Sequence, residues 1–131
     1  MIFLKHIISI FLPPAVLLAI HLLYYQFMPT YGPWDMTMHF LGGVTIAWSG
    51  ARARTFLLEK RYVPKDTPTW LWAWLIWGSV AIAGILWEVY ECLGDVFLGT
   101  RMQPSLNDTM GDLILDLSGG ALFLLSFLKK K

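Results

Sequence analysis

The longest apolar stretch of the chain, residues 69–97, ends in the three carboxylates Glu88, Glu91 and Asp95. A run of about 20 apolar residues is long enough to cross a bilayer as an α-helix. Acidic side chains inside such a run are costly, so they usually face the protein interior or water and belong to a functional site. The stretch therefore predicts a membrane-spanning helix with one apolar half and one polar half.

The composition is that of a small membrane protein. Hydrophobic residues make up 56% of the 131 residues, and the mean hydropathy of +0.57 is high for a soluble domain. The length favours a single domain, residues 1–131. The net charge of +1 gives no reason to expect a nucleic-acid partner, and the lone Cys92 excludes an internal disulfide. We expect an all-α integral membrane bundle whose main partner is the lipid bilayer.

The same reasoning predicts four transmembrane helices. Proline lacks the backbone N–H and clashes with the preceding turn, so Pro13 and Pro14 predict a short interfacial segment and then a helix that they begin. No small-residue cleavage site follows this first apolar run, which favours an uncleaved span over a signal peptide. Ser105 or Asn107 can cap the last helix. The spans are expected at residues 7–27, 35–51, 69–97 and 107–128, joined by a turn at 28–34 and a polar cytoplasmic loop at 52–68.

Basic residues fall almost entirely on one side of this topology. Only Arg101 lies on the other side, and the basic side carries Lys5, Arg52, Arg54, Lys60, Arg61, Lys65, Lys129, Lys130 and Lys131. Because cytoplasmic loops are enriched in lysine and arginine, this side is expected to be cytoplasmic, with both termini inside. Tryptophans 70, 72, 74 and 77 fit an aromatic belt near that boundary, and Tyr24 and Tyr25 fit one at the far boundary.

Acidic residues gather on the opposite, outer side. Within each helix they recur three or four residues apart, so they share one helix face. They are Asp35 with His39 on the second helix, Glu88, Glu91 and Asp95 on the third, and Asp108, Asp112 and Asp116 on the fourth, with His21 of the first helix at a similar depth. Glycines continue these faces inward, and small residues let membrane helices approach closely. The pattern predicts a polar outer cavity above a tightly packed inner half.

Seven carboxylates in a partly dry cavity cannot all remain charged without compensation. Either some are protonated or a cation lies among them. Oxygen-rich sets bind Mg²⁺, Mn²⁺ or Ca²⁺, and the addition of histidine suits Zn²⁺ or iron. The expected metal ligands are Asp35, His39, Glu88, Glu91, Asp108, Asp112 and Asp116, and the expected catalytic residues are Glu88, His39 and Asp112.

Each of these residues also has a purely structural interpretation. Asp35 and Asp108 lie in first helical turns, where an acid caps backbone N–H groups. Asp95 can be solvated near a helix end, and His21 can be a hydrogen-bonded interior histidine. The whole cluster can act as polar contacts between helices, which contribute about 0.6–2 kcal/mol each in membranes.

Three motifs carry a resemblance to known families. They are Asp35-x-x-x-His39-Phe40, the Glu88-x-x-Glu91 pair, and the run Asp108-Thr109-x-x-Asp112-x-x-x-Asp116-x-x-Gly119. Over residues 34–121 the chain resembles the YjdF-like small bacterial membrane proteins and, more loosely, the VanZ-like family. The resemblance implies a helical bundle in the bacterial inner membrane, and the VanZ-like name implies a link to glycopeptide-antibiotic resistance. Asp116 stands where the YjdF-like pattern usually has asparagine.

Three functions remain open from the sequence. The first is a site that binds a divalent cation or a lipid or cell-envelope head group, with metal-dependent hydrolysis or transfer on that head group, because bound metal activates water and polarises ester and phosphoryl oxygens. The second is a non-catalytic binding or protective membrane protein. The third is a proton- or cation-coupled transporter, which would need oligomers because polar groups are confined to the outer half.

Overall fold

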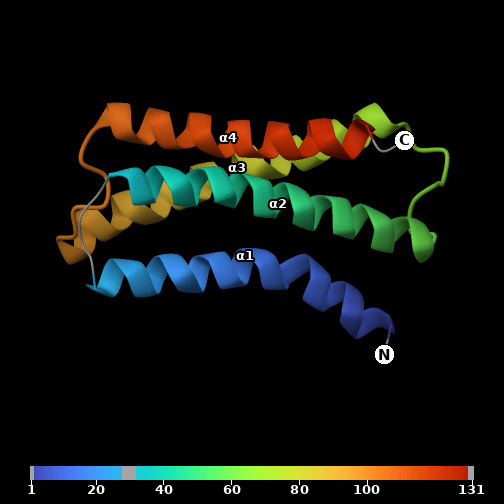
Figure 1. Cartoon of the computed structure of the whole chain (residues 1–131), viewed down its shortest axis with the longest axis horizontal. Helices are drawn as coiled ribbons and strands as arrows, with labels where there is room; N and C mark the ends of the chain where they lie inside the picture. Colours follow the sequence, from blue (N-terminus) through green and yellow to red (C-terminus); the bar gives the residue numbers. More distant parts are fainter. Residues whose placement is uncertain (1, 28–31, 130–131) are drawn as a thin grey trace.

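The computed structural model describes residues 2–27 and 32–129, and all regular secondary structure within these ranges is helical. The four helices are α1 (Ile2–Phe27), α2 (Pro33–Glu59), α3 (Thr69–Leu98) and α4 (Leu106–Lys129). They lie side by side along one axis, and α1 begins at the same end of the bundle at which α4 ends (Figure 1). Most of the turn predicted at 28–34, the side chain of Tyr25, and the terminal Lys130 and Lys131 lie outside the described residues.

Three helices are long and apolar enough to cross a membrane. The qualifying segments are Phe3–Tyr24, Thr69–Leu98 and Leu106–Lys129. Helix α2 has the length of a span, but it carries Asp35, Arg52, Arg54 and Glu59 among its apolar residues. The prediction of an all-helical membrane bundle is confirmed at this level, and the fourth span stays a prediction.

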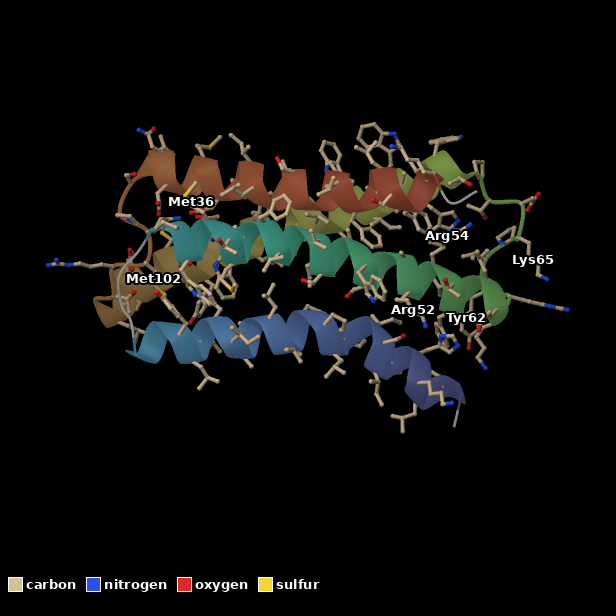
Figure 2. All side chains as sticks on the ribbon, viewed as in Figure 1. Met36, Arg52, Arg54, Tyr62, Lys65 and Met102 are labelled. Atoms are coloured by element: carbon tan, nitrogen blue, oxygen red, sulfur yellow. The ribbon has the colours of Figure 1, made fainter. Side chains whose placement is uncertain are left out.

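The two ends of the bundle differ in charge. We call the end where α1 and α3 finish and α2 and α4 begin the acidic end, and the opposite end the basic end. Arg52, Arg54 and Lys65 lie at the basic end, whereas Met36 and Met102 lie at the acidic end (Figure 2). The separation expected from the order of the helices is therefore present in three dimensions.

Helix α1 continues through its two prolines, contrary to the predicted break at Pro13 and Pro14. A proline at position 14 leaves the carbonyl of Ile10 without its usual helical donor. The hydroxyl of Ser49 on α2 donates to that carbonyl oxygen at 2.5 Å. Neighbouring helices commonly supply such donors in membranes, which explains why the helix persists. It bends within its N-terminal half, where the prolines lie (Figure 1).

Replacing Ser49 with alanine should destabilise the protein by about 1 kcal/mol, because the partly buried carbonyl of Ile10 would lose its donor. Ser126→Ala is the matched control, since the Ser126 hydroxyl is exposed and bonds only within its own helix. Thermal unfolding in detergent, followed by tryptophan fluorescence, measures both variants. Equal midpoints for the two variants would contradict this role of Ser49.

Helix α2 extends to Glu59, so the loop predicted at 52–68 begins eight residues later than expected. The guanidinium carbon of Arg54 lies 5.8 Å from the ring centre of Trp72 and 5.7 Å from that of Phe127. Cation–π contacts of this kind stabilise a partly buried arginine. Arg54, one of the charged residues that predicted a loop, instead packs against aromatic rings of α3 and α4.

Helices α2, α3 and α4 form the packed part of the bundle, and the backbone of α1 approaches α2. Between the middle of the bundle and the basic end lies an apolar core made of Ala47, Ala51, Ile76, Val80 and Leu124. Nearer the acidic end α2 and α4 touch through their backbones. A methyl group at Gly43 would overlap the carbonyl of Asp116, and one at Gly119 would overlap the carbonyl of Phe40.

Candidate metal and head-group site

His39 of α2 is at the centre of the polar cluster and is 4% exposed. Its Nδ1 lies 3.3 Å from Oδ2 of Asp116 on α4, within hydrogen-bonding distance. Its Nε2 lies 3.9 Å from Oδ1 of Asp35 and 3.9 Å from Oδ2 of Asp112. Both distances are too long for a hydrogen bond, so Nε2 has no hydrogen-bond partner. One side of the imidazole is therefore held, and the other faces two carboxylates without bonding to them.

The spacing of these residues along each helix places their side chains on faces that meet. Asp35 and His39 are four residues apart on α2, and Asp112 and Asp116 are four residues apart on α4, so each pair lies on one face. The carboxylate of Asp116 fits between helices because Gly84 has no side chain. A Cβ at Gly84 would lie 2.7 Å from Oδ2 of Asp116. Small residues thus make the room that the polar groups occupy.

Helix α3 contributes Glu88 and Glu91, which are 6% and 2% exposed. Gln103 of the loop before α4 donates its side-chain N–H to Oε2 of Glu88 at 2.9 Å. Trp87 donates its indole N–H to Oε1 of Glu91 at 2.8 Å. The second oxygen of each glutamate, Oε1 of Glu88 and Oε2 of Glu91, is buried without a hydrogen-bond partner. Each carboxylate is therefore oriented through one oxygen and free at the other.

Three overlapping groups of side chains bring ligand atoms within 4.8 Å of one another. They are His21 with Asp35 and Glu91, Asp35 with His39 and Asp112, and His39 with Glu88 and Glu91. Bonds of about 2.0–2.2 Å to Zn²⁺ allow two ligand atoms to be at most about 4.4 Å apart. The separations from His39 Nε2 to the two carboxylates, 3.9 Å each, fall inside that limit, so this nitrogen and either carboxylate are close enough to share an ion.

The remaining predicted ligands are placed differently. Asp116 faces Nδ1 of His39, on the side of the ring away from Asp35 and Asp112. Asp108 is partly buried in the first turn of α4, and its Oδ2 has no hydrogen-bond partner. The predicted cap is Ser105, whose hydroxyl accepts the backbone N–H of Asp108 at 3.2 Å. Asp108 thus lies beside the cluster and is in none of the three groups.

Asp95 organises the loop between α3 and α4. Its carboxylate accepts hydrogen bonds from the Thr100 hydroxyl at 2.6 Å and from the backbone N–H groups of Met102 and Gln103 at 2.7 and 3.0 Å. Three such bonds give Asp95 a structural role in placing Gln103 over Glu88. Sequence reasoning did not identify Gln103, because an amide in a loop carries no signal until the path of the loop is known.

The cluster is strongly acidic and has few basic partners. Among residues 2–27 and 32–129, its carboxylates form ion pairs only with His39, and no lysine or arginine lies within 4.0 Å of them. Buried acids that lack partners carry a large desolvation cost. Chemically, the arrangement suits a bound cation better than a bare anion such as phosphate.

Helix composition, length and the buried cluster together define a small helical membrane protein with a polar site inside its bundle. The chain belongs to the family described as predicted membrane proteins, DUF2238, whose profile matches residues 3–130. Comparison with curated proteins and with solved structures gives no match.

Proposed function

We propose that the protein binds one divalent cation through Nε2 of His39 and the carboxylates of Asp35 and Asp112. The observation that carries this proposal is the state of the His39 ring. Histidines that bind metals almost always donate their other N–H to a carboxylate or carbonyl, which fixes the ring and its tautomer. Asp116 is placed to accept from Nδ1, and Nε2 is buried, unpartnered and directed at two carboxylates.

The proposed setting is the bacterial inner membrane, with four spans and both termini in the cytoplasm. The clustering of basic residues at one end supports this orientation through the positive-inside rule, and α2 would be the fourth span. The cation site then opens near the outer head groups. A reporter joined after Lys131 that is active only outside the cytoplasm would contradict this topology.

The chemistry proposed for the site is metal-dependent hydrolysis or transfer at an ester or phosphoryl bond of a lipid or cell-envelope head group. A bound cation polarises such an oxygen and lowers the pKa of coordinated water. Glu88 and Glu91 form a group with His39 whose ligand atoms lie within 4.8 Å of one another. Their unpartnered oxygens would therefore be near a bound ion and could accept a proton from its water. The resemblance to YjdF-like and VanZ-like proteins supports a cell-envelope setting.

Binding without turnover is the second candidate, and it shares the same cation site. Cys92 is exposed and belongs to none of the three groups, so the proposed turnover relies on activated water and not on this thiol. Transport is not proposed, because the apolar core from Ala47 to Leu124 separates the cluster from the basic end.

The cation site is tested by elemental analysis and titration of the purified protein with Mn²⁺ and Zn²⁺. We expect bound metal in the native chain. His39→Gln should lose more than the ~10–100-fold in metal affinity that is typical when a residue hydrogen-bonded to a metal ligand is removed. His6→Gln is the matched control, because His6 is also buried but pairs with Glu59 at the basic end, at 2.9 Å. A native chain that binds neither metal and melts identically with and without chelator would contradict the proposal.

A further inference from the structure

A groove of about 210 Å³ lies between α1, α2 and α3 and ends at the polar cluster. Its walls are apolar, with Leu17 and Leu18 on α1, Ile46 on α2, and Val80 and Ala83 on α3. Its titratable members lie at one end, and the hydroxyl of Thr45 lies at the other. The titratable members are His21, His39 and Asp116, which belong to both the groove and the cluster described above.

The groove runs along the bundle axis. Each of three helices lines it over a similar length, residues 14–21 of α1, 38–46 of α2 and 80–87 of α3. At a rise of about 1.5 Å per residue these stretches are about 10–12 Å long. Since α2 runs opposite to α1 and α3, the ends at residues 21, 38 and 87 all lie toward the acidic end. The groove therefore extends from the cluster toward the middle of the bundle.

The surroundings of the groove are hydrocarbon. Its stretches on α1 and α3 lie within the membrane-crossing segments Phe3–Tyr24 and Thr69–Leu98. About 20 helical residues cross the hydrocarbon, so a count from the exposed Trp70 reaches the opposite boundary near Tyr90. Trp87 then lies about 4–5 Å below that boundary and Val80 near the midplane. The groove thus occupies one leaflet, alongside the acyl chains of its lipids.

The groove is open to the side. Within the described residues the backbone of α1 approaches α2 and does not approach α3. The two helices meet through the rings of His21 and Trp87, whose centres are 5.1 Å apart. This contact lies at the cluster end, so a chain can enter between α1 and α3 below it without unfolding any helix.

We propose that this groove holds one acyl chain of a membrane phospholipid and thereby places the phosphate of that lipid at the cluster. Lipid tails are as apolar as the groove walls, so the chain alone gains little over the bilayer. Selection must come from the head group. The cluster has no lysine or arginine within 4.0 Å in the described part of the chain, so a cation is required to hold a phosphate there. The head-group half of this proposal therefore rests on the proposed cation site, and the acyl-chain half does not.

The test uses vesicles of phosphatidylethanolamine and phosphatidylglycerol that contain a phosphatidylglycerol with a photoreactive diazirine in its acyl chain. Labelled residues are mapped by mass spectrometry after irradiation. We expect labelling at groove-lining residues such as Leu17, Ile46 and Ala83 to exceed that at Ile82 and Leu86. The latter two are exposed residues of α3 that do not line the groove. A larger side chain in the groove imposes an overpacking penalty, which should lower this labelling about tenfold or more in Ala83→Phe.

Two further variants keep the result interpretable. Leu17→Trp fills the groove from α1, the least packed helix, in case Ala83→Phe does not fold. Ala19→Phe makes the same change as Ala83→Phe on an exposed position outside the groove, and its labelling should equal that of the native chain. Groove labelling no higher than at Ile82, or unchanged in both filling variants, overturns the acyl-chain site.

Chelator separates this proposal from the cation site. Loss of groove labelling with chelator and in His39→Gln supports the placement of the phosphate at a bound cation. Groove labelling that resists both, while Ala83→Phe still abolishes it, supports the acyl-chain site and overturns that placement. Metal bound to a chain whose groove is not labelled leaves the cation site intact and overturns the acyl-chain site.

Discussion

Replacing Asp112 with asparagine is expected to abolish divalent-cation binding, whereas the same replacement at Asp116 should preserve it within about tenfold. Asp112 Oδ2 faces the unpartnered Nε2 of His39 at 3.9 Å, so its charge and oxygen are both needed by a cation. Asp116 Oδ2 faces Nδ1 at 3.3 Å, and an amide oxygen can accept the same N–H.

A third variant, Asp116→Leu, removes the acceptor altogether. Loss of a partner that orients a metal-binding histidine costs about 10–100-fold in affinity, so the expected order of affinity is native, Asp116→Asn, Asp116→Leu, then Asp112→Asn. Asp66→Asn, on the loop at the basic end, is the control for removing one acidic charge. Calorimetric titration with Mn²⁺ and Zn²⁺ measures all five proteins. If Asp112→Asn binds as well as Asp116→Asn, the proposed ligand set is wrong.

A second readout is available from stability. A ligand at 100 times its Kd stabilises the folded state by about 2.7 kcal/mol. The native chain and Asp66→Asn should therefore gain thermal stability when Mn²⁺ is added. Asp112→Asn should gain none. Without added metal it should be at least as stable as the native chain, because the buried carboxylates outnumber His39, their one ion-pair partner in the described residues, and one of them is gone. This reversal of order with metal distinguishes a cation site from polar contacts between helices.

Sequence alone could predict that these acids meet, because helix order and spacing suffice for that. Residues four apart share a face, and antiparallel neighbours bring the start of α2 beside the end of α3 and the start of α4. It could not predict that His39 has one held and one free nitrogen. That depends on the Asp116 carboxylate packing against Gly84, which is 32 positions away in the sequence. It also depends on the close approach of α2 and α4 at Gly43.

The errors in the predicted helices have the same origin. Pro13 and Pro14 are local signals for a break, but the hydroxyl of Ser49 on α2 satisfies the freed carbonyl. Arg54 is a local signal for a loop, but its guanidinium makes cation–π contacts with the rings of Trp72 and Phe127. In each case a side chain distant in sequence supplies the hydrogen bond or the cation–π contact that the segment cannot make by itself. Helix existence was therefore predictable from periodicity and hydropathy, whereas helix ends and continuity depended on tertiary contacts.

The largest loss of stability is expected from Gly43→Ala, a change of one methyl group. That methyl would overlap the carbonyl of Asp116 and lie 3.0 Å from the backbone nitrogen of Gly120. Backbone atoms cannot rotate away as a side chain can, so α2 and α4 must separate. Overpacking typically costs about 1–3 kcal/mol, and we expect the upper end of that range. Thermal unfolding in detergent measures the effect.

Gly78→Ala on α3 is the matched control, because nothing lies within 4 Å of the added methyl. Alanine is the better helix former by about 0.8–1.0 kcal/mol, so this variant should be at least as stable as the native chain. Gly43→Ala should also lose cation binding, since the separation of α2 from α4 moves Asp112 and Asp116 away from His39. If Gly43→Ala unfolds at the same temperature as Gly78→Ala and still binds Mn²⁺, the close approach of α2 and α4 does not position the site. If it is destabilised but keeps full affinity, the glycine contact supports the fold while the cluster assembles independently of it.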